Sequence, residues 1–140
     1  MLHLTKLAVG IRDITHLNQV QQARAAAEPP LRHRTRNFPR RAAELTDGGS
    51  IYWVIAGATL VRQLVVGIVA DNWDDGRACA ALLLDPALVP VAVRATRPFQ
   101  GWRYLDAAAA PADLSAMPDA AGLDELPADL RRALASLGLV

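Results

Sequence analysis

Apolar and polar residues alternate in several short runs of the chain, a pattern typical of β-strands. Over residues 2–9 this alternation places Leu2, Leu4 and Lys6 on one side of a first strand. The Asp75-Gly76 pair is a turn signal between two further apolar runs. The remaining predicted strands cover residues 50–55, 59–70, 77–85, 91–95 and 101–105, and residues 31–36 could form an extended edge strand.

Helical spacing replaces alternation in three places. Apolar positions after Asp13, a suitable N-cap, recur every three or four residues until Pro29 and Pro30. A short helix is predicted over residues 39–45, and a last helix begins near Pro127. We therefore predict an α+β fold: a small, strongly bent, mainly antiparallel sheet or barrel with an N-terminal helix and a C-terminal helix.

The length of 140 residues suits a single domain. Residues 1–106 would form the sheet core with its helix, and residues 107–140 an Ala/Pro-rich wrap with the terminal helix. The only cysteine, Cys79, excludes an intrachain disulfide and favours a cytoplasmic location. Residues 51–70 are apolar enough to raise a membrane span, but Arg62 near their centre argues against it, so no membrane partner is predicted.

A basic, acid-free stretch lies between the first helix and the glycine-rich turn, although the net charge is only +1. On an extended strand, side chains two residues apart share a face at a spacing of about 7 Å, which suits a row of phosphates. The alternative is an edge strand kept soluble by its charge. The predicted phosphate contacts are Arg32, Arg34, Arg36, Arg40 and Arg41.

Cations and aromatic residues are interleaved in the segment RPFQGWRYL, residues 97–105. Together with Tyr52, the side chains of Trp102 and Arg103 could form a surface on which bases stack. The alternative is that these aromatic rings belong to the core. The leading hypothesis is nucleic-acid binding, with RNA preferred to DNA.

Arg62 lies in an apolar strand, either at a barrel mouth or paired with a carboxylate such as Glu44 or Asp47. A second hypothesis is therefore a small-ligand or enzyme domain in which Arg62 or Arg103 holds an anionic metabolite. A third is a protein-interaction module that docks through its acidic tail or terminal helix. An oligomer is compatible with the sequence but nothing in it indicates one.

Patterns of catalytic and metal-binding residues are weak in this sequence. Acid–base work by Glu44 and Asp47 is possible, but no pocket signal accompanies this pair. His3, His16 and His33 lack ligand spacing, and the loop around Trp73 departs from a calcium-binding loop. The chain also has no nucleophile elbow and no phosphate-binding glycine loop. We predict no catalytic residue, no metal and no cofactor, and the sequence leaves open whether the protein is an enzyme.

Four segments carry a resemblance to a known family: MLHLTKLAVG, PRRAAELTDGGSIYWVIAG, LLLDP and RPFQGWRYL. They resemble an uncharacterised family of short alphaproteobacterial proteins, a domain of unknown function, over nearly the whole chain. The resemblance implies a single-domain bacterial protein and carries no activity, cofactor or catalytic residue. More remotely, the order of elements is similar to the RNA-binding barrels associated with pseudouridine synthases.

Overall fold

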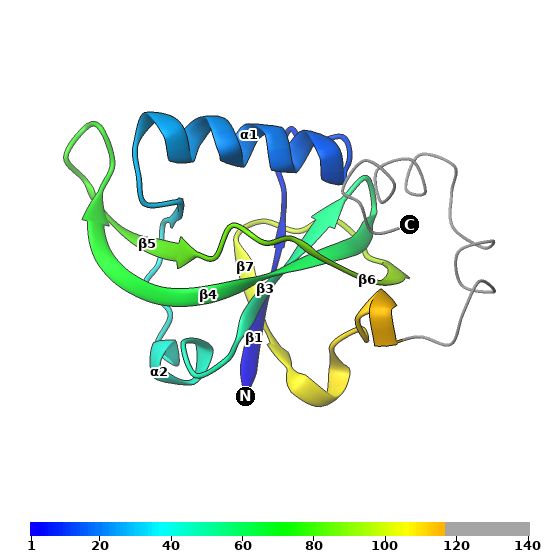
Figure 1. Cartoon of the computed structure of the whole chain (residues 1–140). Helices are drawn as coiled ribbons and strands as arrows, with labels where there is room; N and C mark the ends of the chain where they lie inside the picture. Colours follow the sequence, from blue (N-terminus) through cyan, green and yellow to red (C-terminus); the bar gives the residue numbers. More distant parts are fainter. Residues whose placement is uncertain (117–140) are drawn as a thin grey trace.

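A computed structural model of the chain describes residues 1–116 and shows a mixed, seven-stranded sheet with one long helix along one face (Figure 1). The strands are β1 (Leu2–Leu7), β2 (Arg32–Thr35), β3 (Ser50–Ile55), β4 (Ala58–Asn72), β5 (Ala78–Leu84), β6 (Val89–Ala95) and β7 (Trp102–Asp106). The helices are α1 (Ile14–Ala27), α2 (Ala42–Leu45) and the short 3₁₀ turns η1 (Ala107–Ala109) and η2 (Leu114–Ala116).

The strand order is β2-β5-β4-β3-β1-β7, and β6 pairs with β4 beside this path. Only β1 and β3 run parallel, so the predicted mainly antiparallel sheet is confirmed. The alternative of a closed barrel is wrong, because β2 and β7 remain unpaired with each other. Contacts from residues 37–41 to Trp102 and Tyr104 lie on this open side in place of ladder hydrogen bonds.

Sheet is the dominant structure of the described part, with α1 as its one helix longer than a single turn. The balanced α+β class with a helix at each end is therefore a poor description of residues 1–116. The predicted C-terminal helix and much of the Ala/Pro-rich wrap lie outside the described residues.

Strand β4 gives the sheet its bend. It has 15 residues, pairs with β3 and β6 along its first half and with β5 along its second. The register with β5 shifts between Val65 and Gly67, and such bulges bend a strand and increase its twist. Figure 1 shows β4 curving from the β3 hairpin to the β5 hairpin, so that the sheet partly surrounds one core.

Helix α1 begins where the sequence predicted. Asp13 caps it by accepting a 2.7 Å hydrogen bond from the His16 amide, and the helix ends before Pro29. The short helix α2 begins at Ala42, not at Pro39 as predicted. Among residues 1–116 no helix combines the length and apolar character that a membrane crossing requires.

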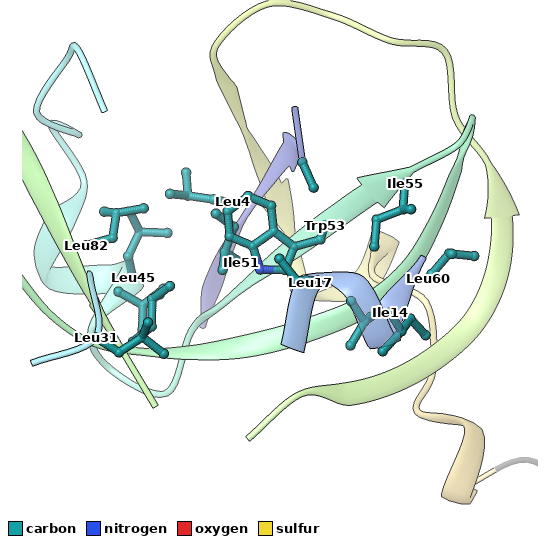
Figure 2. Packing of buried hydrophobic residues seen from close by; sticks show 14 of the residues in the cluster. Leu4, Ile14, Leu17, Leu31, Leu45, Ile51, Trp53, Ile55, Leu60 and Leu82 are labelled. Atoms are coloured by element: carbon teal, nitrogen blue, oxygen red, sulfur yellow. The ribbon is translucent and has the colours of Figure 1, made fainter. Parts of the chain in front are cut away.

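The core lies between α1 and the inner face of the sheet. Trp53 occupies its middle, with Leu4 and Ile51 on one side and Leu17 on the helix side (Figure 2). Burying each such side chain stabilises the fold by roughly 1.5–3 kcal/mol. Leu4 marks the inner face of β1, and the alternation of the strand puts Lys6 on that same face near its end.

A polar network crosses this core. The fully buried Gln63 of β4 exchanges two hydrogen bonds with Gln21 of α1, at 2.8 and 2.7 Å. Gln63 also accepts a bond from the Trp53 indole at 3.1 Å and donates to the Asp85 carbonyl at 2.8 Å. Because satisfied buried networks favour one arrangement, these bonds fix the position of α1 on β4.

Candidate functional site

Three adjoining cavities lie on the open side of the sheet. The first, of about 580 Å³, lies between β1, β2 and β7, and the second, of about 510 Å³, lies between the end of α1, β2 and Trp73. The third, of about 190 Å³, lies between β1, α1 and β2. Arg34 lines all three, and we call them together the seam groove.

Two arginines of the groove already have carboxylate partners. Arg34 donates to Asp71 at 2.9 Å and to Glu28 at 3.2 Å, and Arg32 lies 3.6 Å from the same Asp71 carboxylate. The hydrogen bond from Arg34 lowers the pKa of Asp71 below its ordinary value. The attraction of Arg32 and Arg34 for an external anion is therefore reduced by the chain itself.

The other three predicted phosphate contacts have different surroundings. Arg41 forms a two-bond ion pair with Glu44, at 2.6 and 2.8 Å, and its guanidinium lies over the Tyr104 ring. Arg36 and Arg40 are exposed, and no carboxylate of residues 1–116 pairs with either. Of these three, only Arg36 lines the seam groove.

The predicted stacking residues are not brought together. Trp102 lines the groove and meets Tyr104 edge to face at 5.0 Å, whereas Tyr52 is only 4% exposed and lies on the opposite face of the sheet, against His3. Arg103 lies over Phe99, 4.5 Å from its ring, on the opposite side of β7 from Trp102. Trp102 is the only one of the three in the groove.

Arg62 is paired with a carboxylate, as its position in an apolar strand predicted. The partner is Asp113 and not Glu44 or Asp47. The pair has two hydrogen bonds, at 2.7 and 2.8 Å, and Arg62 also donates to the Ser50 hydroxyl at 3.1 Å. The hydrogen bond from Arg62 lowers the pKa of Asp113. This ion pair fastens the segment around η2 to the outer face of the sheet.

Lys6 is a groove residue that the sequence argument did not select. It lies opposite Trp53 on β3 and Trp102 on β7 in the strand register, and lines two of the cavities. Partial burial lowers its pKa, and within residues 1–116 no ion pair compensates the loss of water. The signal was present, since the chain's one lysine falls on the apolar side of the first strand.

His33 is the second residue that was not selected. Its ring lies against Trp53, which it meets edge to face at 5.1 Å. Its Nε2 atom is buried without a hydrogen-bond partner in the described part of the chain. Burial, and then the charges of Lys6 and Arg24, lowers the pKa of His33 to about 4. The groove thus contains a neutral imidazole beside two cations.

Arg24 and Trp73 complete the groove from positions with no sequence signal. Arg24 reaches it from the last turn of α1, and Trp73 from the β4–β5 hairpin. Across residues 1–116, no three His, Cys, Asp or Glu side chains are grouped as a metal site would require. The chemistry that the groove offers is hydrogen-bond donation, positive charge and aromatic surface.

These features define an open, bent, mixed β-sheet protein with a basic groove along its unpaired side. A family model described as "Protein of unknown function (DUF1489)" matches residues 4–140, and the chain belongs to this family. The predicted membership of an uncharacterised family is thereby confirmed. Neither the curated proteins nor the solved structures include a match to this chain.

Proposed function

We propose that the protein binds single-stranded RNA along the seam groove. The proposal rests on one observation, that cations and indole rings line the same set of adjoining cavities. Arg36 and Trp102 line the largest cavity, Arg24 lines the two others, and Lys6 and Trp73 each line two. Single-strand binders combine the same two elements, a basic groove for the backbone and aromatic rings on which bases stack.

The charge of the groove supports this proposal in spite of its internal ion pairs. The carboxylates of Glu28 and Asp71 neutralise part of the basic lining, and three positive charges remain in excess. The cations concerned are Lys6, Arg24, Arg32, Arg34 and Arg36. An excess confined to one groove attracts a polyanion even though the whole chain has a net charge of only +1.

The largest cavity also favours RNA over DNA. Thr35, Asn37 and Gln100 line it beside Trp102. Hydroxyl and amide groups of this kind can exchange hydrogen bonds with a ribose 2′-hydroxyl, the group by which proteins distinguish RNA from DNA.

Other candidate functions have less support. A small anion held by Arg62 competes with Asp113 and Ser50, which already occupy its guanidinium. Arg103 is turned away from the groove, over Phe99. The acidic tail and terminal helix of a protein-interaction module lie for the most part outside the described residues.

The proposal is tested by fluorescence anisotropy with an unstructured oligouridylate over a range of salt concentrations. If Lys6, Arg24 and Arg36 each neutralise one phosphate, log affinity should fall against log salt with a slope of about −2, from roughly −0.7 per contact. Trp102→Ala should weaken binding about 5- to 150-fold, the range for loss of one stacked base. Oligodeoxyuridylate should bind less tightly than oligouridylate.

Arg94→Ala is the matched control, because Arg94 lies on β6 and lines none of the three cavities. It should leave affinity close to that of the unmodified protein, whereas Arg36→Ala should weaken binding and flatten the salt slope. Affinity that does not change with salt, or equal losses in the two arginine variants, would overturn the proposal.

A further inference from the structure

The smallest cavity of the groove has polar groups that converge on it from three elements. Lys6 comes from β1, Arg24 from α1 and His33 from β2, while Trp53 and Leu84 are among its apolar walls. Its volume of about 190 Å³ is below the roughly 300–1,000 Å³ of sites that hold whole drug-sized ligands. The cavity therefore suits a small charged group rather than a complete nucleotide.

His33 supplies the first reason to expect a ligand atom here. Its Nε2 is buried and has no partner among the described residues, although buried polar atoms in folded proteins nearly always have one. A neutral imidazole protonated at Nε2 would donate a hydrogen bond to an acceptor in the cavity. Because Nε2 is buried, the ring would turn toward the cavity to reach an acceptor oxygen there, and that oxygen would satisfy the ring.

The charges around the cavity supply the second reason. Lys6 and Arg24 have no carboxylate partner within residues 1–116, whereas Arg32 and Arg34, which also line this cavity, are paired with Asp71 and Glu28. Two uncompensated cations match a phosphate monoester, which carries between one and two negative charges at neutral pH. An anion would also offset the desolvation of the Lys6 ammonium.

The form of the phosphate follows from the size of the cavity. A phosphodiester inside a strand carries one charge and has a nucleoside on each side. It therefore cannot be placed in a cavity that is too small for an adjoining nucleoside. A terminal phosphate is attached on one side only and presents three free oxygens, one for each of Lys6, Arg24 and His33. The two larger cavities would hold the nucleotides that follow.

We infer that the Lys6–Arg24–His33 cavity receives the terminal phosphate monoester of an RNA strand, so that the protein recognises a phosphorylated strand end. This inference rests on the RNA binding proposed above. No bond is made or broken, and the three residues act as hydrogen-bond donors to phosphate oxygens.

The first experiment uses phenyl phosphate and inorganic phosphate, without RNA, and follows the His33 imidazole by NMR. Binding of either anion should shift the His33 resonances and raise the His33 pKa, because a negative charge would oppose the effects of burial and of Lys6 and Arg24. Lys6→Met should weaken the response about 10-fold or more, and Arg94→Ala should leave it unchanged. Resonances that stay fixed with both anions would overturn the phosphate site.

The second experiment compares oligouridylates with a 5′-phosphate, a 3′-phosphate or hydroxyl groups at both ends. One of the phosphorylated strands should bind roughly 10- to 100-fold more tightly than the hydroxyl-ended strand, the range of one or two charge-assisted hydrogen bonds. The readout is the ratio of these affinities, which should fall toward one in Lys6→Met and His33→Gln and persist in Arg94→Ala.

The two experiments separate failure of the inference from failure of the proposed function. Equal affinity for all three strands, with the expected salt slope, would overturn recognition of the strand end and leave RNA binding in place. No affinity for any strand, together with a His33 response to phenyl phosphate, would overturn RNA binding and leave a site for free phosphate monoesters.

Discussion

Arg34 on β2 donates a 2.9 Å hydrogen bond to Asp71 on β4, across a sequence separation of 37 residues. The same carboxylate lies 3.6 Å from Arg32, so one acid holds both arginines at the rim of the seam groove. Asp71 therefore limits the positive potential of the groove and orients the two guanidinium groups. An incoming phosphate would have to compete with it.

Asp71→Asn should consequently strengthen RNA binding. The substitution removes one negative charge, and with it the only carboxylate beside Arg32 and one of the two beside Arg34 among the described residues, with little change of shape. Since exposed ion pairs are worth roughly 0.2–1 kcal/mol, the gain in affinity should be about 1.4- to 5-fold at low salt. The salt slope should steepen from about −2 toward −3. Anisotropy titrations at several salt concentrations measure both quantities.

The control for this substitution is Asp75→Asn in the β4–β5 hairpin. Asp75 pairs with the exposed Arg77, and neither residue lines the groove. Both variants lose one negative charge, so a general charge effect would change their RNA affinities equally. If Asp75→Asn tightened binding as much as Asp71→Asn, the groove would not be the place where RNA binds.

Gln21→Ala tests the polar network that fixes α1. Gln21 is buried, donates one hydrogen bond to Gln63 and accepts another from it, so its loss leaves parts of a fully buried amide without partners. We expect the free energy of unfolding to fall by about 2–3 kcal/mol. Gln22→Ala, at an exposed position of the same helix, should cost less than about 0.5 kcal/mol. Urea denaturation compares them, and similar losses in both would show that the network contributes little.

Local pattern was sufficient to predict the elements of this fold but not its open side. Alternation located most strands, and Asp13 together with Pro29 located α1 almost to the residue. Whether a bent sheet closes into a barrel depends on whether its two edge strands pair with each other, and these strands can lie far apart in the sequence. Here β2 has only four residues and pairs with β5, and no ladder of hydrogen bonds joins β2 to β7.

The candidate site shows a similar division. Arg32 and Arg34 lie on β2 and Arg36 follows it, and all three line the groove, but the carboxylates that neutralise two of them come from Glu28 and Asp71, outside that strand. No pattern in one sequence specifies such long-range partners. Lys6 was detectable as the charged residue on the apolar side of β1, whereas the role of His33 depends on the burial of one ring nitrogen.

Stability should depend on His33 below neutral pH. In the folded chain its pKa is lowered from 6.5 to about 4, by burial first and then by Lys6 and Arg24. The unfolded chain therefore binds the proton more readily, and folding stability falls as the pH decreases from about 6.5 to about 4. The full contribution is about 3 kcal/mol, at roughly 1.36 kcal/mol for each pH unit by which the pKa is lowered.

Urea denaturation between pH 7 and pH 4, in a buffer free of phosphate, measures this contribution. His33→Gln should lose less stability than the unmodified protein over that range, because its side chain does not titrate. Lys6→Met should also lessen the loss, since one of the charges that lowers the His33 pKa is gone. The pKa of His3 is lowered as well, so the comparison between variants is the decisive quantity. Identical pH profiles would contradict a buried, neutral His33.

The Arg62–Asp113 ion pair lies on the opposite face of the sheet from the groove, so its loss should lower stability without lowering RNA affinity. Its two hydrogen bonds connect β4 to the segment around η2, where Asp113 also forms a bridge with Val91. Arg62→Ala and Asp113→Ala should each lower the free energy of unfolding by about 1–2 kcal/mol. The double variant should cost little more than either single one, since the two changes remove the same interaction.

Hydrogen exchange should then rise around η2 in all three variants, while RNA affinity stays near that of the unmodified protein, because neither Arg62 nor Asp113 lines the groove. Arg94→Ala removes a different contact, the hydrogen bond from Arg94 to the Ala109 carbonyl. This variant is the control for the rise in hydrogen exchange that the loss of any arginine in this region would cause. A fall in RNA affinity in Arg62→Ala without a change in stability would make Arg62 a ligand-binding residue and contradict the structural role argued for its ion pair.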